Sequence, residues 1–377
     1  MPELSLYIHV PFCLKKCSYC SFVSFSDRAR DKQKYVQALI GEITLGQREG
    51  AAVSTVYLGG GTPSLLSDRQ IGSILEGIHN HYVVDTDAEV TLEANPGTVD
   101  EAYLQSMRKL GINRLSLGIQ SLSEKELAFL GRCHTVEESR RAVIEARQAG
   151  FDNLSLDFIY GLPNRKSCHW ETMLNEIIDL GAEHLSFYGL TLEPDTPLGK
   201  MVASNKTPSP DADQAAEEYE IASRKLMEAG YRHYEISNWA KPGFESRHNT
   251  VYWQRGQYLG IGVAAHSFLD GSRFSNTVNL DEYFMKIKKG QLPREDLEPI
   301  SPELALSETI FLGLRLEEGI SMSDIGHQFS IDLSSRFSAE IAELSGLGLV
   351  EVSADRLKLT PRGRLLGNEV FLRFLPS

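Results

Sequence analysis

Basic residues are outnumbered in this 377-residue chain, which has 38 Lys and Arg against 51 Asp and Glu. The formal net charge of −13 argues against broad nucleic-acid binding, which needs a basic surface. Long apolar runs are missing too, and none reaches the length of a transmembrane helix. The first residues show no basic segment followed by an apolar core, so we expect no signal peptide and a cytoplasmic location. The length suits one barrel-sized domain plus a smaller one.

Cysteine is scarce, with five in the chain, yet three of them fall within eight residues as Cys13, Cys17 and Cys20. Three thiolates on one loop can hold three corners of a cubane [4Fe–4S] cluster, which usually takes four cysteines. The fourth iron then keeps an open site for an exogenous ligand. Radical S-adenosylmethionine (SAM) enzymes use this arrangement, with the amino and carboxylate groups of SAM on that iron. The C-x3-C-x2-C spacing therefore predicts a cluster.

Cysteines at this spacing have two other possible uses, a zinc site and a disulfide. A structural zinc site needs four nitrogen or sulfur ligands, and His9 could be the fourth, but the chain has no second CxxC-like pair. A disulfide is disfavoured because three is odd and no secretory signal is expected. Cys133 and Cys168 lie far from the triad in sequence and are interpreted as structural.

The first 200 residues repeat a short β run, a loop and an amphipathic helix. The six expected strands are 6–10, 55–58, 89–93, 114–117, 153–158 and 184–188. Short connections of this kind imply parallel strands and right-handed crossovers. The pattern predicts an α/β fold with a partial (β/α)6 barrel over residues 1–200, and it leaves a doubly wound sheet open.

The rest of the chain divides into two expected parts. Residues 201–290 are predicted to extend the barrel, with an irregular aromatic-rich stretch at 239–258, and a charged linker is expected at 290–301. Residues 301–377 combine helical stretches with two short β runs, which resembles a winged-helix domain. Because the chain is acidic, we expect this unit to pack or bind a partner rather than bind DNA.

Polar and glycine residues follow several expected strands. Gly59-Gly60-Gly61-Thr62-Pro63 ends the second strand, Glu93 the third and Asp157 the fifth, while Gln120 lies just beyond the fourth. In parallel α/β folds ligands bind at the C-terminal ends of the strands, so these positions should converge. The glycines allow a ligand to approach the backbone, or they form a simple tight turn. Glu93 and Asp157 either cap the next helix or bind a ribose hydroxyl or a methionyl ammonium.

His248 opens a second unusual cluster, His248-Asn249-Thr250-Val251-Tyr252-Trp253. Imidazole is an axial ligand of haem iron, and the aromatic side chains could flank a porphyrin. The alternative is a structural, hydrogen-bonded histidine. His266, His9 and His134 are weaker candidates.

Together these motifs resemble the HemW family, haem chaperones of the radical SAM superfamily that are related to the oxygen-independent coproporphyrinogen III oxidase HemN. The matching segments are Tyr7 to Cys13, the cysteine triad, Gly59 to Ser64, Glu93 to Gly97, Gly118 to Ser121, Asp157 to Pro163 and His248 to Trp253. The resemblance covers nearly the whole chain.

The resemblance implies a [4Fe–4S] cluster on Cys13, Cys17 and Cys20. It also implies SAM contacts at Tyr7, Tyr19, Gly60, Gly61, Thr62, Glu93, Gln120, Arg132 and Asp157. Arg132 could pair with the SAM carboxylate, and its alternative is a surface salt bridge. The resemblance implies that His248 binds haem. It also implies that the protein passes haem to acceptor haem proteins, including respiratory ones.

Two departures separate the chain from the oxidase. Phe22 stands where the oxidase has a fourth cysteine, and only twelve residues precede Cys13. We therefore expect a haem chaperone without coproporphyrinogen oxidase activity, with the oxidase (a coproporphyrinogen III dehydrogenase) as the alternative. Whether SAM is cleaved, how haem is attached, and whether the protein is a homodimer stay open.

Overall fold

A single 12-stranded sheet forms most of the protein in this computed structural model, which describes residues 3–48 and 50–376. Its strand order is β12-β11-β10-β9-β1-β2-β3-β4-β5-β6-β8-β7. The first six strands are β1 Leu4–Val10, β2 Ala52–Gly60, β3 Val83–Ala94, β4 Arg114–Gln120, β5 Leu154–Tyr160 and β6 His184–Gly189. Each of these six strands pairs with the next in parallel.

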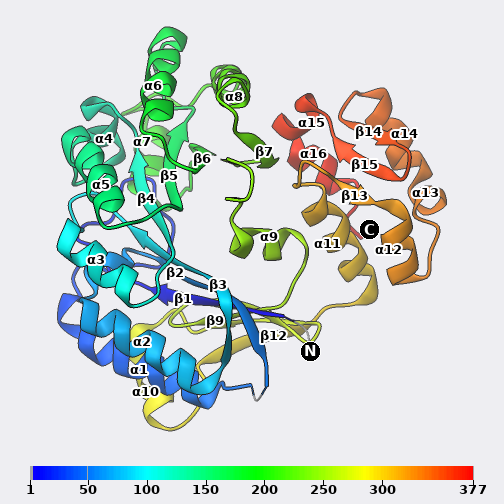
Figure 1. The fold of residues 1–377 in the computed structure, drawn as a ribbon. Coiled ribbons are helices and arrows are strands. Elements are labelled where there is room, and N and C mark those ends of the chain that lie inside the picture. The colour runs from blue at the N-terminus through cyan, green and yellow to red at the C-terminus, as the bar shows by residue number, and fades with distance from the viewer. Residues whose placement is uncertain (1–2, 49, 377) are drawn as a thin grey trace.

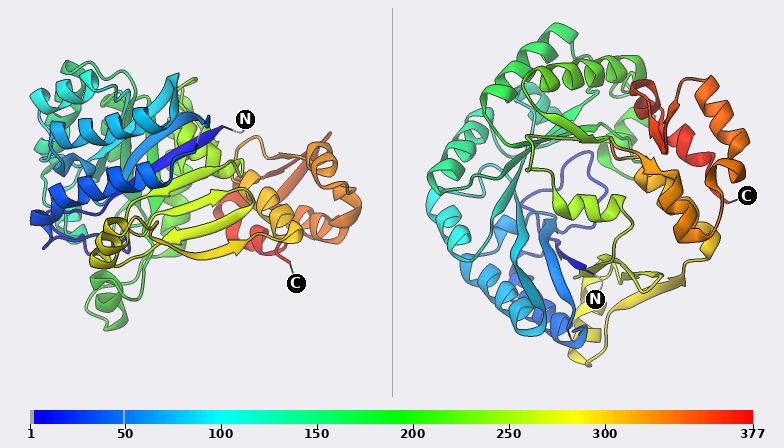
Figure 2. Two further views of the ribbon diagram at one scale, coloured as in Figure 1. Left: turned by 90° about the horizontal axis from the view of Figure 1, so that it is seen from below. Right: turned by 45° about the vertical axis from the view of Figure 1, so that its right-hand side comes forward.

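Helices cover the convex outer side of this curved sheet (Figures 1 and 2). They are α1 Lys32–Leu45, α2 Asp68–His81, α3 Glu101–Lys109, α4 Glu124–Leu130, α5 Val136–Gln148 and α6 Ser167–Asp179. The sequence specifies where α2 starts. The Ser67 side chain accepts a hydrogen bond from the Gln70 backbone N–H, and the Gln70 side chain accepts one from the Ser67 backbone N–H, which makes a capping box. The predicted partial (β/α)6 barrel is confirmed.

Residues 201–299 add strands at both edges of the same sheet. The added strands are β7 Arg232–Glu235 and β8 Asn238–Ala240 beside β6, and β9 Tyr258–Ile261, β10 His266–Leu269, β11 Ser272–Asn276 and β12 Arg294–Pro299 beside β1. The helices here are α7 Pro197–Ala203, α8 Ala212–Glu228, α9 Arg247–Trp253 and α10 Leu280–Lys288.

Two expectations for this region are wrong. The stretch 239–258 is not irregular, because Ser246 caps the seven-residue helix α9. The expected linker at 290–301 contains β12, which pairs with β11. The side chains of β12 are largely exposed and charged. Charged side chains on an edge strand prevent it from pairing with other chains. For this reason the sequence of β12 lacks the alternation of apolar and polar residues by which a strand is usually predicted.

The C-terminal unit has its own apolar core. It contains α11 Pro302–Gly313, α12 Met322–Phe329, α13 Leu333–Arg336, α14 Ser338–Gly346, α15 Pro361–Leu365 and α16 Gly367–Leu372. A three-stranded antiparallel sheet completes it, in the order β13 (Ile320–Ser321), β15 (Arg356–Leu359), β14 (Val350–Ser353). Helices with a β hairpin agree with the winged-helix-like prediction. In the described part of the chain, every helix is too short or too polar to span a bilayer.

Helix α9 lies on the concave side of the large sheet (Figure 2, right). Glu89 of β3 accepts hydrogen bonds from the backbone N–H groups of Arg247 and His248, both at 3.0 Å. A carboxylate at this end satisfies donors that a helix N-terminus leaves free. Residues His248 to Trp253, which form the HNxxYW segment, are therefore held on the inner side of the barrel.

Candidate functional site

The cysteine loop follows β1 and is anchored on two sides. Within the loop, the Cys13 N–H donates to the Phe25 carbonyl at 3.0 Å. At its centre, the Ser18 N–H donates to the Leu130 carbonyl of α4 at 3.1 Å, and the Ser18 carbonyl accepts from the Leu198 N–H at 2.8 Å. These backbone bonds hold the loop against α4 and α7.

The three thiols are free, half-buried and near polar hydrogen-bond donors. Thr62 Oγ1 lies 3.8 Å from the Cys13 sulfur, and Arg132 Nη1 lies 3.4 Å from the Cys17 sulfur. Burial raises the pKa of the Cys20 thiol.

Among residues 3–48 and 50–376, no three His, Cys, Asp or Glu side chains come close enough together to hold a single metal ion. A zinc ion would need its ligands around one point. A cubane needs one thiolate at each of three separate corners. The residues present therefore fit a cluster better than a mononuclear site.

The triple-glycine turn at the end of β2 brings the sheet close to this loop. Gly60 has φ +115°, and a Cβ there would lie 2.6 Å from the His9 ring. A Cβ on Gly61 would lie 2.8 Å from the Phe12 carbonyl oxygen. Only glycine fits at these positions, because any side chain would push β2 away from β1 and the cysteine loop.

Glu93 is buried against the glycine turn. Its carboxylate accepts from Tyr57 Oη at 2.8 Å and from the Gly60 N–H at 3.0 Å. Burial, with a smaller effect from Asp157, raises the pKa of Glu93 to about 7. Burial also raises the pKa of Asp157, although Ser116 Oγ donates to its two oxygens at 3.1 and 3.2 Å. Both acids therefore hold a proton more readily than exposed carboxyls do, and Glu93 does so near neutral pH.

Arg132 is held between the cysteine loop and β4. Besides Cys17, its guanidinium contacts Asn95 Oδ1 and the Gly118 carbonyl, the latter at 2.8 Å. Its Nε is buried and has no hydrogen-bond partner in the part of the chain that the structure describes. The surface salt bridge considered as an alternative for Arg132 does not match these contacts.

One cavity of about 620 Å³ brings most of the predicted residues together. Its lining includes Cys13, Cys17, Cys20, Tyr19, Gly60, Gly61, Thr62, Glu93, Gln120, Arg132 and Asp157. Tyr7 is outside the lining, because its hydroxyl is engaged by His9 Nδ1 at 3.1 Å and its ring stacks on Tyr57. A direct contact between Tyr7 and a ligand stays a prediction.

His248 is also outside the lining, with 1% of its surface exposed. Its Nδ1 lies 2.7 Å from Thr55 Oγ1 and its Nε2 lies 2.9 Å from Tyr252 Oη, so both ring nitrogens are hydrogen-bonded. Burial, followed by the charge of Arg114, lowers its pKa to about 3, which keeps the imidazole neutral. A neutral ring can bind iron, but here one of its two hydrogen bonds would have to break first.

Arg114 and Asn249 are among the lining residues that sequence reasoning did not assign to the site. Arg114 begins β4 and points inward from the strand, and Asn249 comes from α9 within the HNxxYW segment. The sequence did contain a signal for Arg114. This arginine lies two residues before Ser116 on β4, so the two side chains share the face of the strand that lines the cavity.

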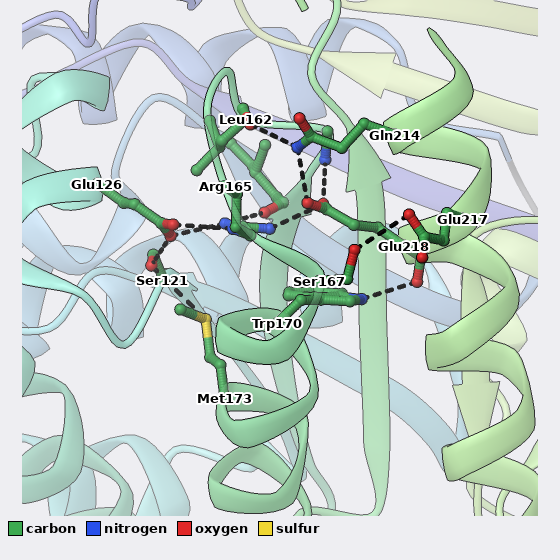
Figure 3. Close-up of polar contacts among 12 residues, drawn as sticks. Ser121, Glu126, Leu162, Arg165, Ser167, Trp170, Met173, Gln214, Glu217 and Glu218 are labelled. Carbon is green, nitrogen blue, oxygen red and sulfur yellow. Dashed lines mark hydrogen bonds and ion pairs between the residues drawn. The ribbon is translucent and has the colours of Figure 1, made fainter. Parts of the chain in front are cut away.

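A buried ion-pair network centred on Arg165 joins α4 to α8 (Figure 3). Arg165 binds Glu126 of α4 at 2.6 Å and Glu218 of α8 at 3.0 Å, and its side chain is 1% exposed. Glu218 also accepts from the Gly161 N–H at 2.7 Å. Since α4 contacts Ser18 through its last turn, this network fixes the helix on which the loop rests.

Comparison with known proteins agrees with this geometry. The Radical SAM superfamily model matches residues 7–177, and the HemN C-terminal domain model matches residues 300–366. "Heme chaperone HemW" of Bacillus subtilis (strain 168) is 35% identical, over 98% of this chain and 99% of the relative. The Escherichia coli (strain K12) protein of the same name is 40% identical over 72% of each chain.

Among solved structures, coproporphyrinogen III oxidase (HemN) from Escherichia coli, a radical SAM enzyme, superposes with a TM-score of 0.86. It is 25% identical, and the match covers 99% of this chain and 90% of the oxidase. Radical SAM proteins use a [4Fe–4S] cluster and SAM, and the thiols and the cavity fit these groups. The chain belongs to the HemW family of the radical SAM superfamily.

Proposed function

We propose that this protein is a cytoplasmic haem chaperone that binds haem and passes it to acceptor haem proteins. The observation that carries the proposal is the near full-length similarity to relatives named heme chaperones. The cavity beside the cysteine loop supports it, because it offers a site of about 620 Å³ next to three free thiols. A reducing compartment would keep those thiols available. A homodimer would be compatible with this role.

Within the proposal, Cys13, Cys17 and Cys20 would hold the cluster. SAM would be held by Tyr19, Gly60, Gly61, Thr62, Glu93, Gln120, Arg132 and Asp157. When bound, these groups supply an electron and a cleavable sulfonium bond. Arg132 lies where it could pair with a carboxylate while steadying the Cys17 sulfur. Gly60 and Gly61 leave the backbone open, and Glu93 offers a carboxylate beside it.

His248 is the proposed haem ligand, and the geometry specifies what its use requires. Tyr252 must release Nε2, or Thr55 must release Nδ1, before iron can bind. A Tyr252→Phe variant keeps the aromatic ring and frees Nε2. If His248 binds haem, this variant should bind haem at least as tightly as the wild type, whereas His248→Ala should bind it several-fold more weakly with the cluster intact.

Haem titrations of the two variants under anaerobic conditions test this assignment. Unchanged haem affinity in His248→Ala would remove His248 from the proposal. The rival function, coproporphyrinogen III dehydrogenase, is favoured by the structural match to HemN and disfavoured by Phe22. Protoporphyrinogen IX formed anaerobically from coproporphyrinogen III with SAM and a reductant would establish the rival.

A further inference from the structure

Arg114 is a buried cation whose side chain makes no hydrogen bond or ion pair within residues 3–48 and 50–376. The residue is 2% exposed, its Nε is buried with no hydrogen-bond partner among these described residues, and its side chain lines the cavity. A buried guanidinium normally pairs with a carboxylate, because a desolvated charge without hydrogen bonds is strongly unfavourable. An arginine in this state calls for a partner that the described part of the chain does not supply.

The acids near Arg114 are all engaged by other donors. Glu89 accepts from two backbone N–H groups of α9, Glu93 from Tyr57 and Gly60, and Asp157 from Ser116. Glu89 and Asp157 affect Arg114 by charge through space and not by direct hydrogen bonds. Its guanidinium therefore keeps its donors free.

Arg114 also lies deep in the cavity. It is the first residue of β4, and Gln120, at the cluster end, is the last. Six residues of strand span about 20 Å. The cavity is lined along this whole length, and Asn249 joins Arg114 in its lining with no side-chain hydrogen bond recorded among the described residues. The end of the cavity away from Gln120 therefore contains side-chain hydrogen-bond donors of Arg114 and Asn249 that no described side chain uses.

We propose that Arg114, assisted by Asn249, is a receptor for a carboxylate arm of the bound ligand. The planar fork of arginine matches a carboxylate with two parallel hydrogen bonds, and an amide can add a third donor. This inference rests on the proposed function, under which the arm is a haem propionate. The other source of a carboxylate in this cavity is SAM.

The experiment compares haem with haem dimethyl ester, which has the same macrocycle without free carboxylates. Both are titrated anaerobically, with SAM present, into the cluster-loaded wild type, Arg114→Met, Arg114→Lys and Asn249→Ala. We expect the wild type to prefer haem about tenfold or more, as befits a charge-assisted pair, and Arg114→Met to show no preference. Arg114→Lys, which keeps the charge, should be intermediate, and Asn249→Ala should lose a few-fold. SAM affinity should be the same in all four proteins.

Several results would overturn the inference. One is a haem preference in Arg114→Met equal to that of the wild type. Another is a loss confined to SAM affinity, which would assign the carboxylate to SAM. If Arg114→Met does not fold, a wild-type preference in both Arg114→Lys and Asn249→Ala also overturns it. Failure of the wild type to bind either porphyrin would instead overturn the proposed function, and this inference with it.

Discussion

Glu93 is the acid whose protonation should control SAM binding. Burial raises its pKa to about 7, so the carboxylate is largely ionised at pH 8 and largely protonated at pH 6. If Glu93 binds the methionyl ammonium, only the ionised form attracts it. SAM affinity should then fall about tenfold between pH 8 and pH 6, in proportion to the ionised fraction. Calorimetric titration with SAM at the two pH values measures this.

Glu93→Gln is the control for this prediction. It keeps the size and one hydrogen-bond acceptor while removing the titration, so its SAM affinity should be weaker and nearly independent of pH. The same pH dependence in both proteins would contradict the prediction, because it would show that the ionisation of Glu93 does not control SAM affinity.

At the scale of elements, the Arg165 network should be a main support of α4 and the cysteine loop. Arg165→Leu would leave Glu126 and Glu218 buried without their counter-ion, so we expect the free energy of unfolding to fall by about 3–5 kcal/mol. Arg140→Leu is a matched control, because Arg140 binds Glu176 at 2.6 Å with both side chains half-exposed, and it should lose less than about 1 kcal/mol. Urea unfolding measures both, and equal losses would contradict the role of the network.

The elements also show what sequence can predict. Strands β1 to β6 were predictable because buried parallel strands are apolar runs that end at glycine or polar residues. Strand β12 was not, because an exposed edge strand is charged. Helix α9 is only seven residues long, too short to show a helical period.

The same contrast holds for the candidate site. The three cysteines are close together in sequence, and so are the three glycines, so each set could be predicted as a group from the sequence alone. The roles of Arg114, Asn249 and the two hydrogen bonds of His248 depend on which side chains the partial barrel brings together. Thr55 and His248, for example, are 193 residues apart in sequence.

At the scale of the whole molecule, Glu42 of α1 joins the barrel to its later strands. It accepts from the Gly262 N–H at 2.8 Å and from Tyr283 and Asn276, both at 2.6 Å. Burial raises its pKa from 4.5 to about 7. The folded state therefore holds this proton more tightly than the unfolded state does. The stability that follows is fully present below pH 4.5 and is lost as the pH rises to about 7.

Unfolding measured from pH 5 to pH 7 tests this linkage. The contribution of Glu42 should fall by up to about 1.4 kcal/mol per pH unit in that window, and Glu42→Gln should lose that part of the slope. An identical slope in wild type and Glu42→Gln would mean that Glu42 is ionised throughout.

This radical SAM scaffold should carry haem and not consume it. The most direct test of that claim is an anaerobic titration of the cluster-reconstituted protein with haem in the presence of SAM, following the haem spectrum and 5′-deoxyadenosine together. We predict stoichiometric haem binding without sustained SAM cleavage. Rapid release of 5′-deoxyadenosine with loss of the haem spectrum would contradict the claim and make the protein an enzyme acting on haem.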